Sequence, residues 1–184
     1  MPWHQGSQLL QAEYVSGGVT MESKKYDVKT GDMIVSLRHL PEVPKTDDSI
    51  RIVRALAMDR SRILKFAAEK FEPNWANEAA QALSHQPSHC FIAIEGGKVV
   101  GFSCYDATAK DFFGPIGVDE SMRGRKVGAA LFIKTLEAMR DDGYVYAIIG
   151  WVSTAAGFYE KLLGAKFIDD SEPENSIYAD RVEG

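Results

Sequence analysis

The chain has 184 residues with a formal net charge of -5, a length that suits one well-buried domain with an appended arm but not two ordinary domains. Its basic residues are not in excess and form no long runs, so the composition argues against a general nucleic-acid binder. No apolar run approaches the roughly 20 residues needed to cross a bilayer, the N-terminus lacks a signal-peptide core, and we expect a cytoplasmic protein with no membrane partner.

Residues 1–30 show no sustained hydrophobic period, and we expect an N-terminal extension over residues 1–49. Within it, Asp32 to Leu40 has the composition of a short strand, which either joins a partner in a homodimer or folds back on its own sheet. Prolines and a polar cluster then predict a linker up to residue 49. The globular domain is expected to cover residues 50–184.

The first half of this domain is predicted to contain a strand and two helices. Ile50 to Ala55 reads as the strand, and Asp59 to Phe71 has apolar residues at the spacing of an amphipathic helix. Asn74 is expected to cap a second helix that runs from Trp75 to about Ser84.

The two histidines after this second helix do not predict a metal site. His85 and His89 are four residues apart, but Pro87 lies between them and no third ligand is evident. We therefore expect no metal.

Two apolar runs, Cys90 to Ile94 and Val99 to Tyr105, flank a Gly-Gly pair that predicts a β-hairpin. If Glu95 faces Lys98, Cys90 lies opposite Ser103. Side-chain alternation then places the two cysteines on opposite faces of the hairpin, where they do not pair.

The stretch from Phe112 to Met139 reads as a buried strand, a basic glycine-bearing loop and a helix. Arg123, Arg125 and Lys126 fall where the helix begins, although the first turn of a helix already carries partial positive charge and unpaired N–H groups. A phosphate-bearing ligand would bind the unpaired N–H groups and neutralise both the helix dipole and the basic side chains. Glycines in this loop allow the backbone to approach such a ligand closely. The alternative is a solvated basic turn.

The C-terminal part is predicted to continue the sheet. Tyr144 to Val152 has strong β propensity, and Ser153 or Thr154 is expected to cap a short helix over residues 155–163. We expect a further strand at 166–168 and a last one at 177–179.

Two motifs now resemble one family, the GNAT N-acetyltransferases of bacterial type. The segment Arg123 to Gly128 is similar to the family's acetyl-CoA loop, in which a Gln or Arg is followed by two residues, a Gly, one residue, and a Gly or Ala. Lys126 stands where the family usually has its first glycine. The segment from Phe158 to Phe167 resembles the family's FYEK-x-GF pattern, although Val152 replaces an Asn often found seven residues before the tyrosine.

The resemblance implies an α/β (α+β) fold with a mixed, mostly antiparallel central sheet, flanking helices and splayed central strands. It implies acetyl-CoA as co-substrate and no metal. Main-chain groups of Ile116 and Val118 are expected to pair with its pantetheine arm, and the loop amides are expected to hold its pyrophosphate. The implied cofactor-binding residues are Ile116, Val118, Arg123, Gly124, Arg125, Lys126, Val127, Gly128, Ala129 and Phe158.

The implied reaction is direct attack of a primary amine, from a small molecule or a peptide, on the acetyl thioester. Tyr159 is expected to act as the general acid, and Asp106 comes first among candidate bases, ahead of Glu72 and His89. An alternative is a non-catalytic acyl-CoA-binding regulatory module, favoured by Lys126 at a glycine position. A nucleotide phosphate-binding domain is disfavoured because no Lys-Ser or Lys-Thr pair follows the loop.

Overall fold

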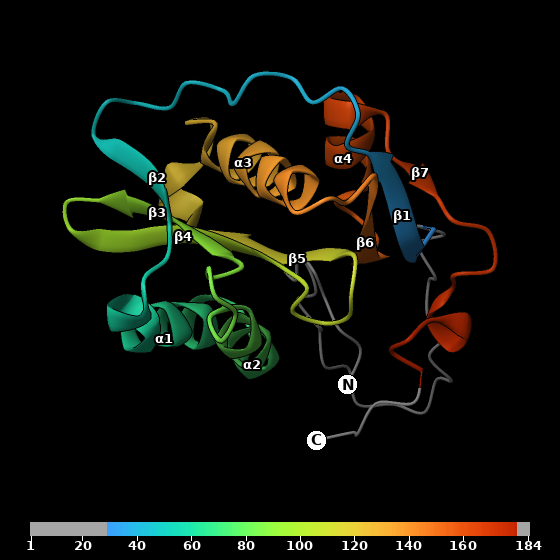
Figure 1. The fold of residues 1–184 in the computed structure, drawn as a ribbon, viewed down its shortest axis with the longest axis horizontal. Helices are drawn as coiled ribbons and strands as arrows, with labels where there is room; N and C mark the ends of the chain where they lie inside the picture. The colour runs from blue at the N-terminus through green and yellow to red at the C-terminus, as the bar shows by residue number, and fades with distance from the viewer. Residues whose placement is uncertain (1–28, 180–184) are drawn as a thin grey trace, which may run out of the picture.

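A computed structural model describes residues 29–179 as a seven-stranded sheet with helices on both faces (Figure 1). The expected extension before Lys29 and the last five residues lie outside the described residues. The strands are β1 (Gly31–Ser36), β2 (Ile50–Arg54), β3 (Cys90–Glu95), β4 (Lys98–Tyr105), β5 (Phe112–Val118), β6 (Tyr146–Val152) and β7 (Lys166–Phe167). The helices are α1 (Arg60–Lys70), α2 (Pro73–Ala82), α3 (Val127–Asp141) and α4 (Ala156–Leu163), with short 3-10 turns at Ala57–Asp59, Glu120–Met122 and Pro173–Asn175.

The sheet has the strand order β2-β3-β4-β5-β6-β1-β7 and is antiparallel except between β5 and β6. This parallel pair is short, because only Phe112 with Ile148 and Phe113 with Ile149 are in register. Beyond them the two strands separate, and Pro115 of β5 has no N–H to offer a neighbouring strand. The mixed, mostly antiparallel sheet with flanking helices and separated central strands is confirmed.

Strand β1 lies between β6 and β7 and is antiparallel to both. The strand expected in the N-terminal extension therefore folds back on the sheet of its own chain. The strand expected at 177–179 is wrong, since those residues form a turn after the short 3-10 helix.

Each face of the sheet is covered by its own helices, which explains why the strands are apolar on both sides. Figure 1 shows α1 and α2 on one face and α3 on the other, with α4 near β6. On the α3 side, Phe132 and Leu136 are fully buried. On the α1–α2 side, Ile63 and Phe102 are fully buried in a separate cluster.

The predicted hairpin forms, but its register differs from the prediction. Glu95 faces Lys98 as expected, whereas Cys90 faces Cys104 rather than Ser103. The pairing shifts between Ala93 and Ile94, where β4 contains one extra residue, a β-bulge that no turn motif announces. The prediction that the two cysteines point to opposite faces is therefore wrong. Both thiols are free and fully buried.

Two predicted helix caps are also wrong. Helix α2 begins at Pro73, before Asn74, because proline fits the first helical position, where no N–H is needed. Helix α4 begins after Ala155, and neither Ser153 nor Thr154 occupies the N-cap position. The existence of both helices was predicted correctly.

Candidate functional site

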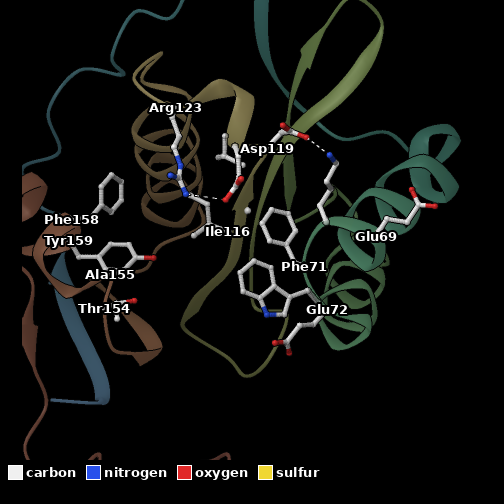
Figure 2. Close-up of a pocket in the computed structure, with 16 residues that line it drawn as sticks. Glu69, Phe71, Glu72, Ile116, Asp119, Arg123, Thr154, Ala155, Phe158 and Tyr159 are labelled. Atoms are coloured by element: carbon white, nitrogen blue, oxygen red, sulfur yellow. Dashed lines mark hydrogen bonds and ion pairs between the residues drawn. The ribbon is translucent and has the colours of Figure 1, made fainter. Parts of the chain in front are cut away.

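A cavity of about 790 Å³ opens where β5 and β6 separate (Figure 2). Its walls come from the ends of α1 and α2 on one side and from α3 and α4 on the other. The strand β5 forms its floor through Ile116, Gly117 and Val118. The cleft therefore exists because the sheet is divided at this point.

The β5 edge that faces β6 has no strand partner beyond Phe113. Main-chain groups left without a ladder partner need another hydrogen-bonding partner or water. Gly117 allows helix α1 to approach this floor, because a Cβ at this position would lie 2.5 Å from the Phe71 ring. The structure thus places Ile116 and Val118 along an unpaired edge that borders the cavity.

The start of α3 presents a set of free backbone amides. Within residues 29–179, the N–H groups of Lys126, Val127, Gly128 and Ala129 donate no hydrogen bond, and the first amide bonded to a loop carbonyl is that of Ala130, 3.0 Å from the Lys126 oxygen. The amides of Arg123 and Arg125, by contrast, are bonded to the carbonyls of Glu120 and Met122. Free amides at a helix start favour an anion, and Gly128 lines the cavity.

Lys126 adopts a left-handed conformation, with φ 62° and ψ 9°. Residues other than glycine adopt this region at a cost, which accounts for the glycine that the family usually carries there. The lysine nevertheless keeps the backbone turn that exposes the amides of α3. The departure noted in the sequence therefore leaves the loop's shape in place.

The three basic side chains of this loop do not converge on the cavity. Arg125 pairs with Glu95 at 2.5 Å and with Asp47 at 2.6 Å, which ties the loop to the β3–β4 hairpin and to the 37–49 linker. The hydrogen bond from Arg125 holds the pKa of Glu95 below its usual value. Arg123 lines the cavity and pairs with Glu120 at 3.1 Å.

Tyr159 projects from α4 into the cleft, and Figure 2 shows its hydroxyl directed toward β5 near Ile116. The residue is 3% exposed and packs against Phe132, with ring centroids 5.2 Å apart, and against Phe158. Burial raises the pKa of the Tyr159 phenol well above its usual value, so the hydroxyl keeps its proton at neutral pH. Its oxygen has no hydrogen-bond partner within residues 29–179.

Asp106 lies away from this cleft, at a separate hollow that it shares with His85. Its carboxylate accepts hydrogen bonds from Lys110 at 2.8 Å, from Tyr144 at 2.7 Å, and from the Asp111 amide at 2.9 Å. Burial raises the pKa of Asp106, but these hydrogen bonds outweigh it, and the net pKa is below the usual value.

Of the other two candidate bases, Glu72 lines the cleft beside Trp75 and His89 does not. The His89 ring is stacked between His85 and Tyr105, with centroids 3.9 Å and 4.0 Å away. No group of three or more His, Cys, Asp or Glu side chains suited to a metal ion occurs within the described residues.

A second, smaller hollow of about 50 Å³ adjoins the cleft and was not predicted. It shares Trp75, Ile116 and Tyr159 with the cleft and adds Glu78 of α2. One sequence signal could have indicated Glu78, because it follows Trp75 by three residues and shares its helix face. The other contributors, Trp151 and Tyr178, come from segments that only the fold brings together.

The sequence model of the acetyltransferase (GNAT) family matches residues 54–165, which is more than half of the chain. The chain belongs to the GNAT acetyltransferase family. This match includes the cleft-lining part of β5, the loop before α3 and Tyr159, while β1 lies outside it. A search of curated proteins finds no significant match.

Solved structures of GNAT proteins share this fold at low sequence identity. A GCN5-related N-acetyltransferase from Sphaerobacter thermophilus matches with a TM-score of 0.61 at 17% identity, covering 77% of this chain and 49% of that one. The glucosamine N-acetyltransferase region of a fungal multi-domain β-N-acetylglucosaminidase gives a TM-score of 0.59 at 16% identity, covering 76% and 20%. A GCN5-related N-acetyltransferase from Kribbella flavida gives 0.54 at 18% identity, covering 75% and 54%.

This GNAT chain thus spans about half or less of each of these structures' own length. None of the helices within residues 29–179 is both long and apolar enough to traverse a bilayer.

Proposed function

We propose that this GNAT protein transfers the acetyl group of acetyl-CoA to a primary amine of a small molecule or peptide. One observation carries the proposal. A single cleft is bordered by free amides at the start of α3 and by a buried, protonated hydroxyl, that of Tyr159. The first arrangement suits a pyrophosphate and the second suits a thiolate leaving group.

The chain's own groups fit acetyl-CoA in order along the cleft. The amides from Lys126 to Ala129 bind the pyrophosphate, and Arg123 adds charge at the cavity wall. The unpaired edge of β5 pairs with the amide groups of the pantetheine arm, as a further strand would. In this proposal the thioester lies near Tyr159, which lines both the cleft and the second hollow.

The thioester supplies an activated acetyl carbon, and the protein supplies donors to the charges that develop on it. A main-chain N–H of β5 stabilises the carbonyl oxygen as it becomes an oxyanion. Tyr159 donates its proton to the sulfur as the C–S bond breaks. A phenol with a raised pKa remains protonated until this step and is then able to regain its proton from the product side.

The position of Asp106 argues against the role of general base that its place in the sequence suggested. Its oxygens are engaged by Lys110, Tyr144 and the Asp111 amide, outside the cleft. A base for this reaction must reach the attacking nitrogen directly or through one water. Among the three bases that the sequence suggested, Asp106, Glu72 and His89, it is Glu72 that borders the cleft.

The second candidate function is a regulatory module that binds acyl-CoA without turnover, and it is motivated by the side chain that Lys126 places where the resemblance expects a glycine. Isothermal titration with acetyl-CoA and a free-thiol assay with a broad amine panel separate the two. The enzyme reading predicts binding together with amine-dependent release of CoA. Binding without CoA release for any amine would support the module and overturn the transferase.

A further inference from the structure

The small hollow beside the cleft has walls that are aromatic or apolar, with one carboxylate among them. Trp75, Trp151, Tyr178 and Phe113 contribute rings, and Trp151 and Tyr178 pack edge to face with centroids 5.3 Å apart. Glu78 is the one acidic side chain in the lining. Aromatic faces attract cations, and a carboxylate among them fixes where the positive charge sits.

Glu78 is held in place but has an oxygen to spare. Its Oε1 accepts a hydrogen bond from the Thr108 hydroxyl, and its Oε2 has no hydrogen-bond partner within residues 29–179. Burial raises the pKa of Glu78 above its usual value, with the Thr108 hydrogen bond acting in the opposite sense. A desolvated carboxylate gains most from a cationic partner, and it is a better proton acceptor than a solvated one.

The charged groups of the large cleft also favour a cationic ligand on the side of α1 and α2. On the α1–α2 wall, Lys70 is paired with Asp119 and Glu69 with Lys65, which leaves Glu72 as the carboxylate without an ion-pair partner within residues 29–179. On the opposite wall, Arg123 is paired with Glu120 beside the free amides of α3 (Figure 2). An anionic group is therefore favoured along α3, and a cationic one along α1 and α2. Glu78 lies on α2, one helical turn beyond Trp75, and therefore on the side of the cleft where a cationic ligand is favoured.

We propose that Glu78 binds the ammonium group of the acceptor and removes its proton, so that the acceptor is a primary alkylammonium on a slender apolar chain. The assignment rests on the proposed acetyl transfer and names its acceptor class and its base. The shared lining of the two hollows brings the nitrogen past Trp75 and Ile116 to the side of Tyr159.

The proton balance closes with these groups alone. Glu78 takes one proton from the ammonium, and the nitrogen lone pair then forms the C–N bond to the acetyl carbon. The C–S bond breaks, and the thiolate takes the Tyr159 proton. The amide nitrogen releases its extra proton to the phenolate, which restores Tyr159, and Glu78 releases its own proton to solvent.

Several titratable groups face Glu78 and bear on its pH response. Cys104 of β4 interacts with it electrostatically, and its thiol has a pKa raised well above the usual value, chiefly by burial. On its outer side, Glu78 borders the hollow that also contains His85, Asp106 and Lys110. His85 and Lys110 come from the α2–β3 and β4–β5 loops, which border this same outer hollow.

The test compares the full chain with its Glu78→Gln variant, because glutamine keeps an oxygen that accepts the Thr108 hydrogen bond. Hexylammonium, hexanol and hexanoate serve as probes of matched length, and calorimetry reports their affinities together with that of acetyl-CoA. We expect hexylammonium to bind the natural chain at least about ten-fold more tightly than hexanoate. We expect Glu78→Gln to weaken hexylammonium about ten-fold and to leave acetyl-CoA affinity unchanged.

The matched control is Glu137→Gln, which removes a carboxylate from α3 outside both hollows and is expected to change neither affinity. Equal binding of hexylammonium and hexanoate, or an unchanged hexylammonium affinity in Glu78→Gln, would overturn the assignment of Glu78. These readouts need no turnover. If hexylammonium binds through Glu78 but no CoA is released, the amine site stands and the proposed transferase function fails. If Glu78→Gln keeps full turnover, the transferase function stands and the assignment of Glu78 as the base fails.

Discussion

Lys126 is one of five described non-glycine residues with a positive φ, and it is the one that lies in the loop before α3. Lys126 has φ 62° and Gly124 has φ 77°, so the loop before α3 turns through the left-handed region twice. A residue with a Cβ at such a position costs about 1–2 kcal/mol. The loop therefore stores a small strain next to the amides that we assign to the pyrophosphate.

Replacing Lys126 by glycine is expected to raise the free energy of unfolding slightly, by about 0.5 kcal/mol, because relief of strain exceeds the added freedom of the unfolded chain. Urea unfolding measures the change. The matched variant Gly124→Ala introduces a Cβ at the second left-handed position and is expected to destabilise the protein by about 1–2 kcal/mol. If the Lys126→Gly protein is less stable than the natural one, the claim that the backbone at Lys126 is strained is wrong.

Tyr159→Phe removes the proposed acid while keeping the ring that packs on Phe132. We expect kcat to fall by about 10² to 10⁴-fold, with acetyl-CoA affinity unchanged. Stability is expected to change little, because the hydroxyl has no hydrogen-bond partner within the described residues to lose. Steady-state kinetics with calorimetry decide the matter, and unchanged kcat would remove Tyr159 from the mechanism.

At the scale of elements, local sequence patterns predicted correctly those helices and strands whose structure is determined within one segment. The hydrophobic period predicted α1 to within one residue at each end, and Gly96-Gly97 predicted the hairpin. Features that depend on two segments were missed. The bulge after Ala93 and the neighbours of Glu78 arise from packing between strands and helices, for which no single stretch carries a signal.

The corrected hairpin register predicts two inert thiols. Cys90 and Cys104 face each other with no exposed surface, and burial raises the pKa of Cys104 well above its usual value. The thiolate is the reactive form. We expect neither cysteine to react with a thiol reagent such as Ellman's reagent until the protein unfolds, when both react together. Rapid labelling of one thiol in the folded protein would contradict this.

At the scale of the whole molecule, β1 joins the N-terminal part of the chain to its last strands. Composition predicted a strand there but left open whether it pairs with its own sheet or with a partner, because both choices satisfy its backbone equally. In the structure Met33 is fully buried between β6 and β7, whereas Ile34 is 37% exposed.

Met33→Ala is therefore expected to reduce the free energy of unfolding by about 2–5 kcal/mol, the usual cost of deleting a buried methionine side chain. Ile34→Ala, one position along and on the other face of the strand, is expected to cost less than about 1 kcal/mol. Chemical denaturation of both variants measures the difference. Equal small effects would mean that β1 is not part of the stable sheet.

Protonation of His89 links the stability of the whole fold to pH. Burial, and then the neighbouring His85, lower the pKa of His89 below 6.5, against the opposing pull of Asp106 and Asp142, while Lys110 adds to the lowering. The unfolded chain therefore binds the proton more readily. Stability contributed by neutral His89 is full above about pH 6.5 and is lost as the pH falls through the folded pKa.

Thermal denaturation between pH 8 and pH 5 is expected to show this loss in the natural chain. A His89→Gln variant is expected to be less stable at pH 8, because it loses the ring stacked on Tyr105, but to decline less between pH 6.5 and pH 5. Parallel curves for the two proteins would show that another group is responsible.

The position of β1 also has a consequence for the order in which the molecule assembles. The Asp32 amide donates to the Ser171 hydroxyl, a contact between residues 139 positions apart. Strand β1 leaves the ribosome among the first segments of this fold, yet β6 and β7 are among the last. Contacts of such long range slow folding because the intervening loop must close first. The far half of the sheet therefore becomes complete only after both β6 and β7 have been synthesised.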